Sequence, residues 1–113
     1  MKIKILIPVY NDWQSVFKLL KNINSEISTL PHEFSVIIVN DSSTEPINEI
    51  PDNLENFKSI QIIDMKENMG HARCVASGLK YTYEKQEFDY IIPVSYTHLR
   101  AHETEADLVC RLL

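Results

Sequence analysis

The sequence predicts an α/β fold, a three-layer sandwich built on a mainly parallel sheet. Three observations predict it. Short runs rich in isoleucine and valine, typical of strands buried on both faces, recur along the chain. Stretches with apolar residues at helical spacing separate some of these runs, and polar, turn-forming residues follow them. Strands joined by segments of crossover length pair in parallel through right-handed connections.

The first half of the chain predicts a strand, a helix and a second strand. Residues 2–9, KIKILIPV, form the first strand, whose ladder should end near Pro8 because proline has no amide to donate. A helix follows to about residue 28, capped by Asn11 or Asp12. Its apolar stripe consists of Trp13, Val16, Leu20, Ile23 and Ile27. The second strand covers residues 34–40, FSVIIVN.

The second half repeats the pattern. Residues 46–58 are polar and indicate at most a short, poorly packed helix. The third strand covers residues 59–65, SIQIIDM, and the loop KENMG follows it. A helix begins at His71, and a fourth strand opens at residues 88–92. The apolar stripe of that helix consists of Ala72, Val75, Ala76, Leu79 and Tyr83.

Length and composition restrict the function. The 113 residues suit one domain, and 44% hydrophobic with 24% charged residues is typical of a globular protein. A net charge of -5 excludes a generally basic surface, so we expect no nucleic-acid partner. The first apolar run is too short to cross a bilayer and lacks a signal-peptide pattern, which favours a cytoplasmic location. Two cysteines, Cys74 and Cys110, make neither a disulfide framework nor a metal pair.

Polar segments follow the predicted strands and should gather at one edge of the sheet, where ligands bind in such folds. They are PVYND at residues 8–12, NDSST at 40–44 and KENMGHAR at 66–73. The chain has only two glycines, Gly70 and Gly78, so it carries neither a Walker A loop nor a GxGxxG loop. An ordinary P-loop or dinucleotide site is thereby excluded.

Three residues in these segments are candidates for ligand contacts. Asp41 could accept a hydrogen bond from a ring imide or a ribose hydroxyl, or could simply form an Asx turn. Tyr10 could stack on a base, or belong partly to the core. Arg73 would place a cation near helix amides that favour a diphosphate, or be a solvated surface residue.

The motifs ILIPVYND, VIIVNDSST and NMGHARCVASGL, in this order, resemble the N-terminal nucleotide-binding half of the family 2 glycosyltransferases. That resemblance covers about residues 2–92 and implies the GT-A fold with its Rossmann-like half. The usual second motif is Val-Asp-Asp-Gly-Ser-Thr-Asp. Here Asn40 replaces the first aspartate, Ser42 the glycine and Glu45 the last acid, while Asp41 matches the nucleotide-contacting aspartate.

The resemblance implies a donor site in residues 1–93. Its nucleotide-binding residues would be Pro8, Val9, Tyr10, Asn11, Asp41, Asn68 and Arg73. Pro8, Val9 and Tyr10 would wall the nucleoside pocket. Family members transfer a hexose from a nucleoside-diphosphate sugar, here a UDP- or GDP-sugar, to an acceptor. NMGHARCVASGL resembles the branch that contains polyprenyl-phosphate sugar transferases, so a polyprenyl phosphate or a cell-surface glycan is the expected acceptor. The parent protein could then be associated with the cytoplasmic face of a membrane.

The resemblance also implies a divalent cation, Mg²⁺ or Mn²⁺, held by an Asp-x-Asp motif just after the fourth strand. The cation would offset charge on the leaving diphosphate. No such motif follows FDYIIPV here, so we assign no metal ligand and no catalytic residue. We expect a fragment truncated after its fourth strand and without transferase activity.

Residues 94–113 have a different character and are expected to be a non-native tail. Codons that can encode VSYTHLRAHET and DLVCRLL resemble the two ends of a transposase-type sequencing adapter, so the segment reads as translated adapter. A natural C-terminal helix is the alternative. His98 and His102, with Glu103 beside them, could imitate a metal-binding face, although no third ligand stands at a defined spacing.

A different class of function stays open beside the enzyme. A non-catalytic α/β binding module of the receiver or flavodoxin type also places acids at strand ends. The segments PVYN and NMGHAR, however, have no counterpart in the phosphorylation or flavin sites of such modules. Titration with UDP or GDP against FMN would separate the two.

Overall fold

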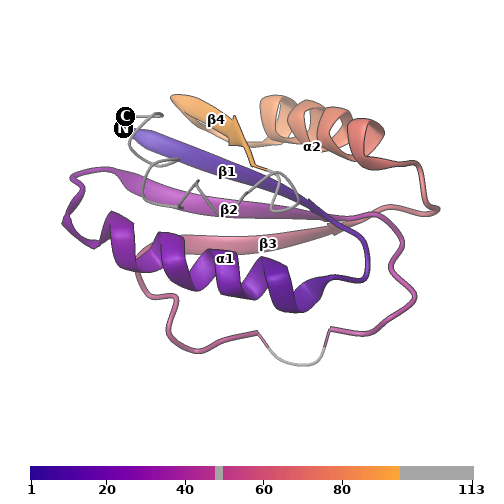
Figure 1. Cartoon of the computed structure of the whole chain (residues 1–113). Helices are drawn as coiled ribbons and strands as arrows, with labels where there is room; N and C mark the ends of the chain where they lie inside the picture. The colour runs from indigo at the N-terminus through magenta and orange to yellow at the C-terminus, as the bar shows by residue number, and fades with distance from the viewer. Residues whose placement is uncertain (48–49, 95–113) are drawn as a thin grey trace.

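The computed structural model describes residues 1–47 and 50–94, which form a four-stranded, fully parallel sheet between helical layers (Figure 1). The elements are β1 (Lys2–Val9), α1 (Trp13–Glu26), the 3₁₀ turn η1 (Ile27–Thr29), β2 (Glu33–Asn40), β3 (Phe57–Asp64), α2 (His71–Lys85) and β4 (Tyr90–Pro93). The strand order is β3-β2-β1-β4. The predicted α/β class and parallel sheet are confirmed.

Strand β1 lies between β2 and β4, and it contains a proline, Pro8. Toward β2 the pairing continues past Pro8 to Val9, opposite Asn40. Toward β4 the pairing ends at Leu6, whose carbonyl accepts from the Val94 amide at 2.8 Å. In a strand, the N–H and C=O groups of residues two apart point to the same neighbouring strand. Pro8, two residues after Leu6, therefore has its backbone nitrogen on the β4 side, beyond the last described pair. The expectation that the ladder ends near Pro8 is confirmed toward β2, where β1 ends at Val9. Toward β4 the residues that would face Pro8 lie outside the described part of the chain.

The sheet separates two cores because alternate side chains point to opposite faces. The larger core lies between the sheet and α1 and takes the odd-numbered residues of β1. Helix α1 contributes the predicted apolar stripe up to Ile23, and Leu19 in addition, while Ile27 of the stripe lies in η1. The smaller core lies between the sheet and α2 and has four buried members, Leu6, Ile37, Val39 and Cys74.

Helix α2 meets the sheet through small residues, which differs from the predicted stripe. Its buried residues are Cys74, Gly78 and Thr82, spaced four apart on one face. Of the predicted stripe, Tyr83 is 78% exposed, and only Val75 and Leu79 pack partly against the core. Small residues contribute little to a hydropathy pattern. The larger apolar residues beside them therefore led the sequence analysis to predict the wrong buried face of α2.

The connection from β2 to β3 contains no helix within its described residues, 41–47 and 50–56, and β3 begins earlier than predicted. The buried side chain of Asn24 on α1 holds this segment. Its Nδ2 donates to the Asn53 carbonyl at 3.1 Å, and its Oδ1 accepts from the Asn56 amide at 2.9 Å. Leu54 packs into the larger core between these two contacts. Hydrogen bonds from the Asn24 side chain therefore hold this segment, where the sequence indicated at most a short helix.

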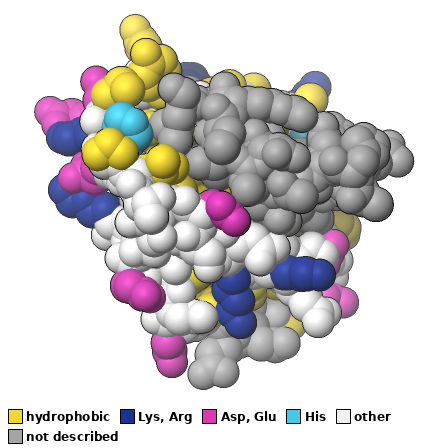
Figure 2. Space-filling model, turned by 60° about the vertical axis from the view of Figure 1, so that its left-hand side comes forward, with side chains coloured by type: hydrophobic (Ala, Val, Ile, Leu, Met, Phe, Trp, Pro, Cys, Tyr) yellow, Lys and Arg dark blue, Asp and Glu magenta, His cyan; other side chains and the backbone are white. Residues whose placement is uncertain are grey.

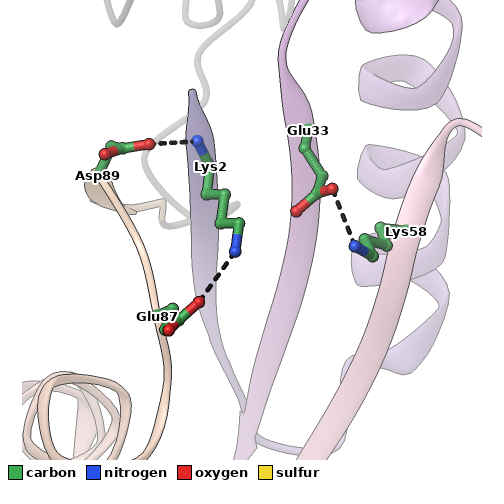
Figure 3. A network of polar contacts seen from close by, with 5 residues as sticks. All are labelled: Lys2, Glu33, Lys58, Glu87 and Asp89. Carbon is green, nitrogen blue, oxygen red and sulfur yellow. Dashed lines mark hydrogen bonds and ion pairs between the residues drawn. The ribbon is translucent and has the colours of Figure 1, made fainter.

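The amino ends of the strands form one edge of the sheet, opposite the edge formed by their carboxyl ends (Figure 3). The Lys2 amide donates to Asp89 at 2.6 Å and its Nζ pairs with Glu87 at 3.0 Å, while Lys58 pairs with Glu33 at 2.9 Å. The Lys58–Glu33 pair joins β3 to β2, and the Lys2–Glu87 pair joins β1 to the segment before β4. Both pairs are exposed and contribute little to stability. Figure 2 shows acidic and basic side chains interspersed on one face of the molecule.

Of the predicted tail, Val94 is described and packs into the larger core, whereas the predictions for residues 95–113 lie outside the described residues. They include the adapter-derived segment and the candidate metal-binding face at His98, His102 and Glu103.

Candidate functional site

Three loops meet at the carboxyl edge of the sheet, where ligands bind in parallel α/β folds. They follow β1, follow β2 and precede α2. The Asp41 amide donates to the Val9 carbonyl at 2.8 Å, and the Met65 amide donates to the Asn40 carbonyl at 2.8 Å. These bonds hold the carboxyl ends of β1, β2 and β3 side by side, so residues far apart in the sequence lie at the same edge of the sheet.

Asp41 is the centre of this edge and is only 5% exposed. Its Oδ1 accepts from the Met69 amide at 2.7 Å and its Oδ2 from the Gly70 amide at 3.0 Å. The Asn68 side chain donates to the Asp41 carbonyl at 3.3 Å. The loop before α2 is therefore folded around one carboxylate. A carboxylate has about four acceptor sites, so beyond these two bonds and one from the Cys74 thiol it can accept one more hydrogen bond.

Cys74 lies fully buried in the first turn of α2, next to Asp41. Burial, and then a hydrogen bond to the Asp41 carboxylate and its negative charge, raise the pKa of the Cys74 thiol to about 12 from 9.0. The thiol is therefore neutral near pH 7 and is no nucleophile there. The sequence-based interpretation of Cys74 as a plain thiol agrees with this geometry.

The raised pKa of Cys74 predicts a loss of stability at alkaline pH. An unfolded thiol ionises near pH 9, whereas the folded one keeps its proton to about pH 12. Between these values the unfolded state binds fewer protons, so the free energy of unfolding should fall by up to about 1.4 kcal/mol per pH unit. Urea unfolding from pH 8 to 11 measures this slope. Cys74→Ser keeps a hydroxyl donor and removes the ionisation, so parallel pH curves for the two proteins would refute the assignment.

Asn11 joins the loop after β1 to the loop after β2. Its Oδ1 accepts from the Thr44 amide at 2.8 Å and from the Glu45 amide at 2.9 Å. Its own amide donates to the Ser43 hydroxyl at 2.9 Å. Asp12 next to it caps α1 by accepting from the Ser15 amide at 3.4 Å, which decides between the two predicted caps.

The departures from the usual second motif have local reasons. Ser42 has φ 58°, a left-handed conformation that glycine adopts most easily. Asn40 donates through Nδ2 to Asp64 Oδ1 at 2.9 Å and accepts at Oδ1 from the Ser43 amide at 3.0 Å. An aspartate at position 40 would place a second carboxylate against Asp64, whereas the amide attracts it. Sequence reasoning noted Asn40 as a replacement and missed this contact.

The other candidate residues differ in accessibility. Tyr10 is 47% exposed, and Asn68 and Arg73 are exposed as well. Pro8 and Val9 are buried, and Val9 packs into the larger core. The structure therefore brings the backbone of all the candidates to one edge. It leaves the side chains of Tyr10, Asn68 and Arg73 open to solvent.

A cavity of about 610 Å³ lies at the opposite, amino edge of the sheet. Its lining residues are Met1, Lys2, Pro31, Glu33, Glu87, Phe88 and Asp89. The polar contacts of Figure 3 occupy its charged side chains. None of the described residues form a group of three or more His, Cys, Asp or Glu that could hold a metal ion. No helix within the described part of the chain is both long and apolar enough to cross a membrane.

Comparison with known proteins decides the family. The sequence profile described as Glycosyl transferase family 2 matches residues 4–94. The chain belongs to this family. The match begins within β1 and ends just after β4, so it spans all three site loops of this family 2 chain.

Two relatives of this family 2 chain are each similar over 81 residues, or 70% of the chain. An uncharacterized glycosyltransferase of Rickettsia bellii (strain RML369-C) is 35% identical. The dodecaprenyl-phosphate galacturonate synthase of Rhizobium johnstonii (strain DSM 114642 / LMG 32736 / 3841) is 22% identical. The matched region spans only 11% and 24% of the lengths of these two relatives.

Solved structures support the same fold for the family 2 chain. The crystal structure of S. aureus TarS superposes with a TM-score of 0.61 at 21% identity, covering 97% of this chain and 19% of that one. A structure of S. aureus TarS 1-349 gives a TM-score of 0.57 at 22% identity, with 85% and 27% coverage. The predicted GT-A-like fold is confirmed by this similarity.

Proposed function

We propose that this family 2 chain binds the nucleotide of a nucleoside-diphosphate sugar, as the donor half of an enzyme that transfers a hexose. The observation that carries the proposal is the arrangement of the carboxyl edge. Asp41 and Asn11 fix three loops by hydrogen bonds, and Tyr10 and Arg73 stand exposed on those loops and on the first turn of α2. Such a rigid frame with exposed aromatic and cationic side chains suits a nucleoside diphosphate.

Each candidate residue has a distinct part in the proposal. Tyr10 stacks on the base, and the free acceptor site of Asp41 accepts from the base or the ribose. Arg73 and Asn68 lie near the amino end of α2, where the helix amides favour the negative diphosphate. Pro8 and Val9 support the pocket from within the sheet.

The donor and acceptor of the whole protein are part of the proposal too. A UDP- or GDP-sugar is the donor. The Rhizobium johnstonii relative is named for a dodecaprenyl-phosphate product, which supports a polyprenyl phosphate as the acceptor. A divalent cation, Mg²⁺ or Mn²⁺, would neutralise the leaving diphosphate in the whole enzyme. The described residues do not form a site for it, so no step through a metal is assigned to them.

Nucleotide titration tests the proposal. UDP or GDP should bind, FMN should not, and Tyr10→Ala or Arg73→Ala should each weaken binding about 10-fold, since a lost stacking or ionic contact is worth 1.4 kcal/mol or more. Isothermal calorimetry or ¹⁵N NMR measures the affinities. Tyr83→Ala and Lys80→Ala, exposed positions elsewhere on α2, are matched controls and should leave binding unchanged.

Two outcomes would contradict the donor site. A preference for FMN over both nucleoside diphosphates would support the non-catalytic binding module instead. Equal effects of the Tyr10 and Tyr83 substitutions would show that the carboxyl edge is not where the nucleotide lies.

A further inference from the structure

Asn11 combines an unusual backbone conformation with a filled hydrogen-bonding group. Its φ of 63° lies in the left-handed region, where asparagine and aspartate are tolerated and most other residues are strained. Its side-chain oxygen accepts from two successive amides of the next loop, those of Thr44 and Glu45. The Thr44 hydroxyl also donates to this oxygen at 3.3 Å, and a carbonyl oxygen has only two lone pairs, so its acceptor capacity is fully used.

The side-chain nitrogen and the backbone amide of Asn11 each donate one hydrogen bond to the same loop. Its Nδ2 donates to the Thr44 hydroxyl at 3.1 Å, and its backbone amide donates to Ser43. All these contacts reach the segment just after Asp41. On its other side Asn11 directly follows Tyr10, so its left-handed turn sets the direction in which the chain leaves the exposed tyrosine.

We infer that Asn11 is a positioning residue of the donor site: it holds the Tyr10 loop and the loop at residues 41–45 in register and does not itself touch the nucleotide. The inference rests on the proposed function. It also differs from the role that the family resemblance implied for Asn11, which was a contact with the nucleotide.

Three substitutions separate the two roles. Asn11→Asp keeps the left-handed tolerance and an oxygen that accepts from both amides, but adds a negative charge. Asn11→Gly keeps only the backbone freedom, and Asn11→Ala loses both features. A positioning role predicts that affinity for UDP or GDP at 0.15 M salt stays within about 3-fold for Asn11→Asp and weakens about 10-fold for Asn11→Ala, because only the latter releases the loops. Asn11→Gly should lie between them.

A second readout tests the clamp without any nucleotide. Amide hydrogen exchange, followed by ¹⁵N NMR, should be slow at Thr44 and Glu45 in the wild type and in Asn11→Asp. Exchange at both amides should be faster in Asn11→Gly and Asn11→Ala. Urea unfolding confirms that each variant is folded under the conditions used. If Asn11→Ala does not fold, the comparison of Asn11→Gly with Asn11→Asp carries the test.

The outcomes are distinguishable. If Asn11→Asp protects both amides yet loses as much affinity as Asn11→Ala, then Asn11 contacts the ligand and the inference is overturned. Equal exchange rates at Thr44 and Glu45 in all four proteins would also overturn it. If the wild type binds neither UDP nor GDP, the proposed function fails, whereas the clamp still stands or falls on the exchange rates.

Discussion

Replacing Gly78 with alanine should destabilise the chain by up to about 2 kcal/mol, because the added methyl group has no room and overpacking costs about 1–3 kcal/mol. A Cβ atom at position 78 would lie 2.6 Å from Leu6 Cδ1 and 2.7 Å from Val39 Cγ2. Both side chains are fully buried, and valine has little rotamer freedom with which to move away. Helix α2 would therefore have to move off the sheet. The higher helix propensity of alanine, about 1 kcal/mol over glycine, offsets only part of this cost.

Urea unfolding of matched variants measures the effect of Gly78→Ala. Ser77→Ala, at the adjacent exposed position on α2, should be neutral or slightly stabilising. Val39→Ala removes one of the two close contacts of the new methyl group, so the double variant should lose less stability than the sum of the two single changes. A stabilising effect of Gly78→Ala would show that α2 does not approach the sheet as closely as this structure has it.

Much of this fold could be predicted because its two central strands, β1 and β2, are buried on both faces. Runs such as ILIPV and VIIV are apolar at every position, and few other structures accommodate them. The periodic stripe of α1 was equally informative, since large apolar residues mark its buried face. The carboxyl edge followed from these elements, because parallel strands end together.

The parts that could not be predicted depend on contacts that leave no pattern in the sequence. The buried face of α2 consists of small residues whose role is close approach rather than apolar area. Asn24 looks like any polar residue of a helix, yet it anchors a segment about 30 residues away. Two of the partners of Asp41 are backbone amides, which every residue except proline has. Sequence reasoning could therefore name Asp41 and could not foresee what it holds.

Replacing Asp41 with alanine should cost about 2–4 kcal/mol, because two hydrogen bonds to a buried charge are lost and their donors keep no protein partner. Those donors are the Met69 and Gly70 amides at the entrance to α2. The free energy of unfolding in urea measures the loss. Asp64 is the matched control, since it also ends a strand but is exposed and accepts one side-chain bond, from Asn40. Asp64→Ala should change stability by less than about 0.5 kcal/mol.

Asp41→Asn distinguishes holding the loop from contacting the nucleotide. The amide keeps one acceptor oxygen and turns a second donor toward a backbone amide, so one of the two bonds is lost and stability should fall by about half as much as in Asp41→Ala. If Asp41 also accepts from the base or the ribose, affinity for UDP or GDP should fall about 10-fold even where Asp41→Asn is fully folded. Wild-type affinity in the folded variant would leave Asp41 a purely structural role. Equal losses of stability in Asp41→Ala and Asp64→Ala would contradict the structural role as well. The buried carboxylate of Asp41 would then stabilise the fold no more than the exposed carboxylate of Asp64.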